Sequence, residues 1–209
     1  VDLDIRSGKN QLKLSGASDN NLNLQFDLEV LEPGSLWPGL EGQWRGQGSV
    51  KQINGSPVGT LVLQGNDVTY GNFHIESYQG SFSCDANDTQ KCKARVKLTN
   101  LKVDDEVFPS LLINWMGDLK NHWVKADLVS STVRANVEFN GECYSDTWKF
   151  RFDSASFDLE NSGTWRLNNH PVDVLVDHRG IKPFKACWAQ EDSKVCVDAS
   201  WSAGQGWKA

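Results

Sequence analysis

Polar and apolar side chains alternate without exception from Asn21 to Val30. Successive side chains of an extended chain point to opposite faces, so this run predicts a β-strand with one apolar and one solvated face. The question that follows is what the apolar face contacts. The apolar positions of the run are Leu22, Leu24, Phe26, Leu28 and Val30.

The same alternation returns along the chain and predicts an all-β fold. Turn dipeptides such as Gly117-Asp118 and Asn140-Gly141 separate the alternating runs. We therefore expect consecutive, mostly antiparallel strands joined by short turns, in one continuous domain over residues 1–209. The apolar positions of the later runs include Val96, Leu98, Val133, Val137, Phe139, Phe150 and Phe152.

Two segments could depart from the all-β pattern. Ser35 could cap one helical turn that Pro38-Gly39 ends, so we expect a short helix near Ser35–Trp37. Val107 to Leu119 also fits a helical apolar stripe. Its alternation toward the Gly117-Asp118 turn, followed by a returning apolar run, favours a strand there.

The composition excludes several classes of protein. The chain has 209 residues, 39% of them hydrophobic, and a formal net charge of −6. These values are typical of a globular domain with a core and argue against disorder. An acidic chain without a dense basic patch is a poor binder of nucleic acid, and no apolar run reaches the length of a membrane-spanning helix. The chain starts at Val1 without a signal run and stops without a closing element, so we expect a piece of a longer protein.

The five cysteines suggest two disulfides in an oxidising compartment. Cys84 and Cys92 bracket one polar loop, and Cys187 and Cys196 bracket another. Each pair would close a hairpin, which leaves Cys143 over. A zinc site is the weaker alternative, because no Cys-x-x-Cys is present and the four histidines are not clustered with the cysteines.

Candidate catalytic chemistry is sparse. The sequence has no nucleophile elbow, no His-Glu-x-x-His and no phosphate loop. Asp177-His178 is more simply a strand-end pair than an acid and base. Nine tryptophans could stack on sugars, but several lie in alternating runs, where core packing is the simpler role. We expect no enzyme, no cofactor and no metal.

The apolar face alone leaves several folds open. A second sheet could cover it, a closed calyx could wrap it round a ligand, or a membrane barrel could turn it toward lipid. The mean hydropathy of −0.48 argues against the membrane barrel. The segment Gly42-Gln43-Trp44 matches the short Gly-x-Trp motif of lipocalins.

Two longer stretches resemble the TamB-like family of the wider AsmA-like group. Residues 36–48, LWPGLEGQWRGQG, resemble its L-x-P-x-L-x-G-x-x-x-G segment. Residues 133–176 are similar in order and spacing to consecutive strands of the middle region of that family. These strands are followed by a Cys-Trp hairpin, here Cys187-Trp188 to Cys196.

This resemblance implies a long, curved, mostly antiparallel sheet that forms an open, taco-like groove with an apolar interior. It implies a periplasmic segment of a protein held in the inner membrane by a helix outside this sequence. The implied function is to conduct phospholipid acyl chains between the membranes, with the Omp85-type protein TamA contacted by other regions. The alternatives are a scaffold that guides outer-membrane β-barrel proteins, and a closed lipocalin-like carrier. We expect the groove to be lined by the twelve apolar residues named above, from Leu22 to Phe152.

Overall fold

The computed structural model describes residues 1–17, 22–53, 56–84, 92–118, 120–144, 146–160, 162–203 and 206–208. The described residues form antiparallel β-strands and one 3-10 helix, which confirms the prediction of an all-β, antiparallel fold. The chain divides into two compact units, residues 1–114 and 115–209.

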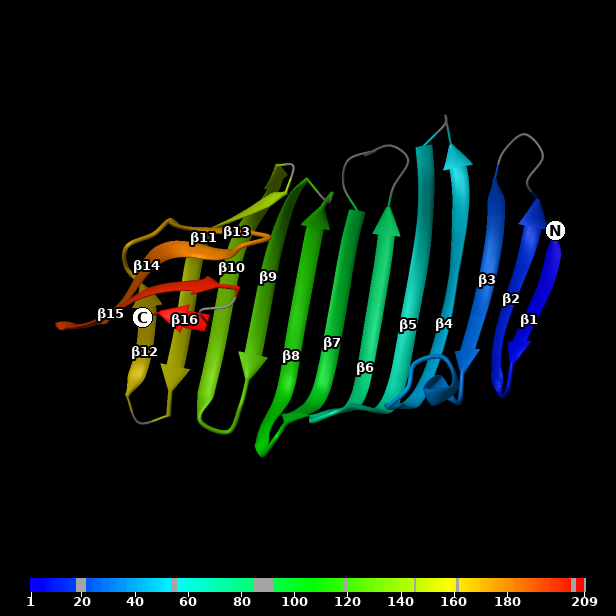
Figure 1. Cartoon of the computed structure of the whole chain (residues 1–209), viewed down its shortest axis with the longest axis horizontal. Coiled ribbons are helices and arrows are strands. Elements are labelled where there is room, and N and C mark those ends of the chain that lie inside the picture. The colour runs from blue at the N-terminus through cyan, green and yellow to red at the C-terminus, as the bar shows by residue number, and fades with distance from the viewer. Residues whose placement is uncertain are drawn as a thin grey trace. The chain divides into compact units, whose positions relative to one another are not determined.

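In the first unit, each strand from β1 to β7 pairs with the next strand of the sequence (Figure 1). Among the described strands, β1 pairs with β2 alone, so this part of the sheet does not close into a barrel. The strands are β1 Asp2–Ser7, β2 Asn10–Ala17, β3 Asn23–Val30, β4 Leu40–Ile53, β5 Ser56–Tyr70, β6 Phe73–Cys84, β7 Cys92–Val103 and β8 Glu106–Gly117, whose end crosses the unit boundary.

The segment from Val107 to Gly117 is a strand, as its alternation indicated. The strand that was predicted from Asn21 begins at Asn23 in the structure, and Asn21 lies outside the described residues. Leu22 precedes β3, and its carbonyl oxygen accepts a hydrogen bond from the Gln52 N–H at 2.8 Å.

The prediction of a short helix near Ser35–Trp37 is wrong. The segment forms a single 3-10 turn, Pro33–Ser35, so Ser35 ends the turn instead of capping a helix. The Pro33 carbonyl oxygen accepts the N–H groups of Leu36 and Trp37 at 2.9 and 2.8 Å. Pro38 follows at once, and a proline disfavours helical geometry in the residue before it, so the turn does not extend.

Asn10 holds this turn in place. Its side-chain oxygen accepts the N–H groups of Leu31 and Glu32 at 3.0 and 2.8 Å. Its amide nitrogen donates to the Glu32 carbonyl oxygen and to Ser35 Oγ, both at 2.9 Å. Asn10 is only 5% exposed, and these four bonds satisfy the polar side chain that β2 buries.

The second unit has a branched strand order. The half of β11 near Thr147 pairs with β13, and the half near Leu159 pairs with β12. Both β12 and β13 then pair with β14, and β14, β15 and β16 pass in front of β10 and β11 in Figure 1. The strands are β9 Asn121–Val129, β10 Val133–Tyr144, β11 Thr147–Leu159, β12 Gly163–Leu167, β13 Val172–Asp177, β14 Gly180–Gln190, β15 Ser193–Ser202 and β16 Gly206–Lys208.

A small core forms where these strands meet. Leu167, Val172 and Ala186 are buried together, and side chains from β11, β13 and β14 pack against them. The packing residues are Phe152, Ala155, Val174, Phe184 and Trp188.

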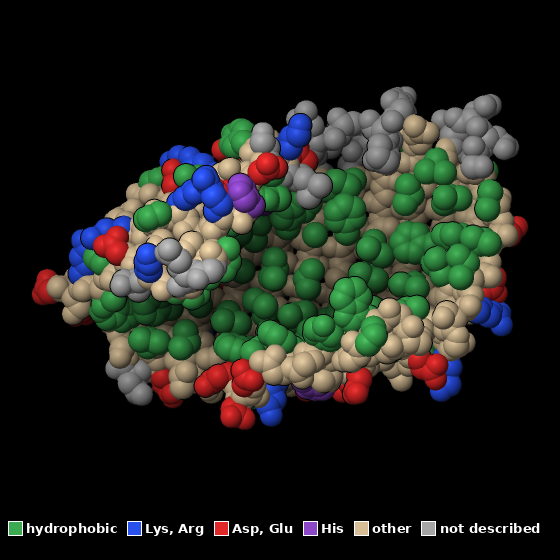
Figure 2. All heavy atoms as spheres, viewed as in Figure 1, with side chains coloured by type: hydrophobic (Ala, Val, Ile, Leu, Met, Phe, Trp, Pro, Cys, Tyr) green, Lys and Arg blue, Asp and Glu red, His purple; other side chains and the backbone are tan. Residues whose placement is uncertain are grey.

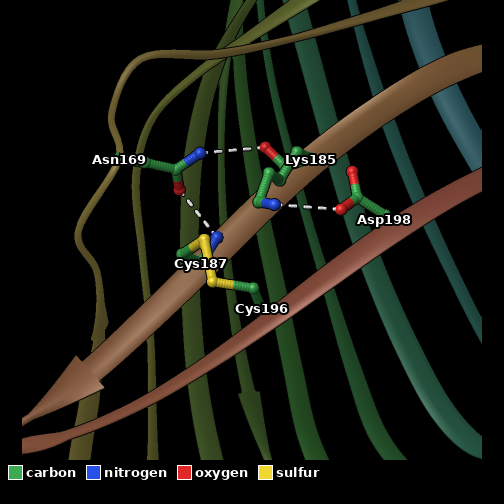
Figure 3. Close-up of a disulfide and its surroundings, with 5 residues drawn as sticks. All are labelled: Asn169, Lys185, Cys187, Cys196 and Asp198. Carbon is green, nitrogen blue, oxygen red and sulfur yellow. Dashed lines mark hydrogen bonds and ion pairs between the residues drawn. A yellow bond between two sulfur atoms is a disulfide. The ribbon is translucent and has the colours of Figure 1, made fainter.

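Two disulfides join neighbouring strands, Cys84 to Cys92 across β6 and β7, and Cys187 to Cys196 across β14 and β15. Figure 3 shows the second disulfide with Asn169 beside it. The Asn169 side-chain oxygen accepts the Cys187 N–H at 2.7 Å, and its amide nitrogen donates to the carbonyl oxygen of residue 185 at 2.9 Å. The β14–β15 hairpin is therefore tied both to itself and to the loop that follows β12.

Candidate functional site: the apolar face of the sheet

The register of the first unit aligns apolar side chains in continuous rows across the strands. Side chains directly opposite one another on neighbouring antiparallel strands share one face of the sheet. No member of these rows is charged. The first row consists of Leu12, Leu28, Gly46, Leu63, Gly80 and Val96. The second consists of Leu14, Phe26, Gly48, Leu61, Phe82 and Ala94, and the third of Val30, Trp44, Gly65, Tyr78 and Leu98.

Glycines in these rows make room for aromatic rings from the neighbouring strand. A Cβ atom added at Gly48 would lie less than 3.0 Å from the ring of Phe26. One added at Gly65 would lie equally close to the ring of Tyr78. The rings therefore lie over bare backbone, and burial raises the pKa of the Tyr78 hydroxyl. A ring that lies over glycine backbone keeps the row apolar at a position that has no side chain of its own.

This face of the first unit is open to solvent over much of its area. Most of the large side chains in the three rows are only half-buried. Figure 2 shows hydrophobic side chains spread over β1 to β7, with charged side chains along the edge of the unit. Val30 is the exception, at 2% exposed, and it belongs to the core of the first unit.

The opposite face of the first unit is polar. Arg45 and Glu29 form an ion pair there at 3.0 Å, and a shallow hollow around them is lined mainly by polar side chains from β2 to β5. The sheet therefore separates an uncharged face from a charged one, as the alternation of the sequence requires.

The second unit carries an aromatic series on its apolar face. The His122 ring lies between the rings of Trp115 and Trp148, with centroid distances of 6.2 and 5.8 Å. Trp148 stacks on Phe150 at 6.1 Å, and the Phe150 ring meets Phe139 edge to face at 5.6 Å. Rings at these distances attract one another, so the series is a stable, ordered surface.

Part of this face is covered by the protein itself. Phe152 packs against the buried cluster that includes Val172 and Ala186, and Phe157 lies 6.0 Å from the ring of Trp188 on β14. The groove residues predicted from the sequence thus occupy two environments. Side chains such as Phe26 lie on the half-exposed rows of the first unit, whereas Phe152 contacts the small core of the second.

The remaining predicted positions fall on the same apolar faces. Val96 and Leu98 end the first and third rows of the first unit, and Leu24 lies opposite Val50. On β10, Val133 lies opposite Leu159 of β11. Val137 lies between Ala126 of β9 and Ala155 of β11, and Phe139 lies between Val124 of β9 and Phe152 of β11.

Within the described part of the chain, the polar groups do not assemble into a reactive set. Asp177 pairs with Lys182 and Arg179 at 2.9 and 3.3 Å. Lys182, together with the Arg179 backbone N–H at 2.8 Å, holds the pKa of its carboxyl well below the usual range. Such a carboxylate is an ion-pair anchor, not a base suited to neutral pH. Among the described residues, no three His, Cys, Asp or Glu side chains gather as a metal site would require.

Sequence reasoning missed the glycine positions and the aromatic rings that lie over them. Gly46, Gly48 and Gly65 are spaced at intervals that match the alternation of β4 and β5, but glycine carries no hydropathy signal. Their role is visible only in the register, which places Phe26 and Tyr78 opposite two of them. In the described part of the chain, no helix has the length and apolar character needed to cross a bilayer.

The fold and this face define an antiparallel β-sheet protein with an extended, uncharged, partly open apolar surface. A family model described as the N-terminal domain of TamB matches residues 1–209, so the chain belongs to the TamB family. The resemblance seen in the sequence pointed to the middle region of that family, whereas the matching model is that of the N-terminal domain.

The chain is also similar to a curated relative, the translocation and assembly module subunit TamB of Haemophilus influenzae. The two are 25% identical over 214 residues, which cover 98% of this chain and 16% of the relative. The chain therefore spans about one sixth of the length of that protein. No solved structure matches the chain.

Proposed function

We propose that the apolar face carries the acyl chains of phospholipids, as one segment of a longer periplasmic conduit between the inner and outer membranes. The observation that carries this proposal is the set of rows without a charged member, which cross β2 to β7 on a half-exposed face. Apolar contact is non-directional, so an acyl chain can move from one strand to the next without breaking specific bonds.

The separation of the two faces supports the same function. An acyl chain gains about 0.8 kcal/mol for each methylene removed from water, whereas a headgroup is stable only where it keeps its hydration or finds polar partners. The apolar rows offer no charged partner, so the headgroup would stay at the open side. Such a conduit needs no catalytic residue and no cofactor.

Site-specific photo-crosslinking in the full-length protein tests this function. A photo-reactive residue at Phe26 or Val137 should trap phospholipid, because each position lies on the apolar face of its own unit. The matched controls are Gln25 and Glu138, the neighbouring positions on the polar face. Lipid trapped equally from both faces, or only from Gln25 and Glu138, would rule out the apolar face as the path.

A second candidate function is a scaffold for outer-membrane β-barrel proteins, in partnership with TamA through regions outside this chain. The name of the relative, a subunit of a translocation and assembly module, favours it. Strand β1 also carries the exposed apolar side chains Leu3 and Ile5, which an unfolded segment could contact. Crosslinks from Leu3 or Ile5 to nascent barrel proteins, without lipid crosslinks from Phe26, would favour the scaffold.

A further inference from the structure

The polar face of β7 carries three cations in one line. Lys93, Arg95 and Lys97 occupy alternate positions of the strand, and all three side chains are exposed. Alternate side chains on one face of a strand lie about 6.8 Å apart, so the three cations span roughly 13 Å. We refer to these three residues as the basic line.

No described residue forms an ion pair with the basic line. On β6, the residues opposite the line are Ser83, Ser81 and Gln79. The other neighbour of β7, strand β8, has one acidic residue, Glu106, at its first position.

The nearest acids along the same rows are distant. The rows continue through neutral residues of β5, and the first carboxylates they meet are Asp27 and Glu29 on β3. Four strand spacings separate β3 from β7, or about 19 Å, which is roughly two Debye lengths at physiological salt. Along these rows, on the β6 side, the positive potential of the basic line is therefore not neutralised. Glu76 on β6 lies outside the rows and accepts a hydrogen bond from Asn100, three residues beyond Lys97.

The position of β7 inside the sheet argues against a protective role for these cations. Lysine is common on edge strands, where it prevents aggregation, but β7 lies between β6 and β8. Elsewhere on the polar face, Arg45 pairs with Glu29 and Arg6 pairs with Asp4. The three cations of the basic line repel one another at their spacing, and a bound anion would relieve that repulsion.

The line is held rigidly. The β6–β7 ladder extends from Phe73 opposite Val103 to Cys84 opposite Cys92. The Cys84–Cys92 disulfide closes this ladder directly before Lys93. The spacing of the three backbone positions is therefore fixed before any partner arrives, which lowers the entropic cost of binding.

We propose that the basic line is a docking site for an extended acidic segment of a partner protein. Alternate side chains of an extended partner repeat at the same spacing of about 6.8 Å, so each Asp or Glu at alternate positions meets one cation. The line is one strand wide, whereas an anionic membrane surface engages a broad basic patch. Charge complementarity and matching repeat together select the acidic strand. This site lies on the polar face and does not depend on lipid transport.

Peptide binding to the intact protein tests the proposal by fluorescence anisotropy. The probe is a nine-residue peptide with glutamate at alternate positions, and its control has the same composition with the glutamates consecutive. Replacing all three cations, by Lys93→Ser, Arg95→Ser and Lys97→Ser, should weaken binding of the alternating peptide about tenfold at physiological salt. Thermal melting of the variant verifies its fold, and the single change Arg95→Gln should weaken binding about twofold.

A matched variant removes three exposed cations from other strands of the same face, through Lys13→Ser, Arg45→Ser and Lys51→Ser. This variant should bind the alternating peptide within about twofold of the unchanged protein. Equal loss in both triple variants, or equal affinity for the two peptides, would overturn the proposal in favour of unspecific attraction. Tighter binding to vesicles that contain anionic lipid than to the alternating peptide would overturn it in favour of a membrane surface.

Discussion

Replacing Phe26 by aspartate interrupts the second apolar row at one defined strand. Phe26 lies between Leu14 on β2 and Gly48 on β4. One strand spacing of about 4.8 Å corresponds to about four methylenes of an extended acyl chain. One-sided contact with those methylenes is worth about half of full burial, or about 1.5 kcal/mol.

The aspartate adds a second cost, because its carboxylate must lose part of its hydration when the acyl chain covers it. We take this cost as about 1.5 kcal/mol, at the low end for a polar group that loses water. A barrier raised by about 3 kcal/mol slows passage roughly 100-fold. We therefore expect Phe26→Asp to reduce lipid transfer by the full-length protein to about 1% of its original rate.

The assay is transfer of a fluorescent phospholipid between donor and acceptor vesicles. The matched control is Gln25→Asp, which adds the same charge on the polar face between Ser15 and Ser49 and should leave transfer unchanged. Phe26→Leu keeps the row apolar and should reduce transfer less than about threefold. Transfer at the original rate by a folded Phe26→Asp variant would refute the reasoning that the rows form the path.

Three further predictions concern stability. Gly48→Ala should destabilise the protein by about 2 kcal/mol in urea unfolding, because the new Cβ would overlap both backbone and ring atoms. The control is Gly80→Ala, whose Cβ would lie 3.8 Å from the nearest atom, Cβ of Leu63, and which should change stability by less than about 0.5 kcal/mol. Removing the second disulfide through Cys187→Ser and Cys196→Ser should cost about 2.6 kcal/mol from loop entropy, measured the same way, and no loss would contradict that account. Because the pKa of Asp177 is lowered, its contribution to stability is full at neutral pH and is progressively lost as the pH falls from about 5 toward 2. Asp177→Asn should therefore flatten the acid side of a stability profile measured by thermal melting. An unchanged profile would contradict the role of this ion pair.

The alternation of the sequence was enough to predict the fold class. The runs through Phe26, Val96 and Val137 all became strands, because a period of two places every second side chain on one face only if the chain is extended. It also decided the ambiguous segment around Trp115, where the alternation outweighed a competing helical stripe.

Local signals were weaker where backbone geometry competed with them. Ser35 resembles a helix cap, but the prolines on either side of it restrict the backbone to a single 3-10 turn. The buried Asn10 that anchors this turn lies on a different strand, and nothing in its sequence neighbourhood distinguishes it from any other polar residue.

The sequence by itself determined that this chain forms strands with one apolar and one polar face, since that property depends only on neighbours along the chain. The tertiary structure decided which side chains meet across strands, because register is set by pairing over long separations. It placed Phe26 over Gly48 and set the basic line opposite neutral residues of β6. It also packed the partly buried Phe152 against the small core of the second unit, whereas Phe26 lies on the open rows of the first. Residues with the same pattern therefore differ in their surroundings, and only the fold distinguishes a side chain on an open face from one beside a core.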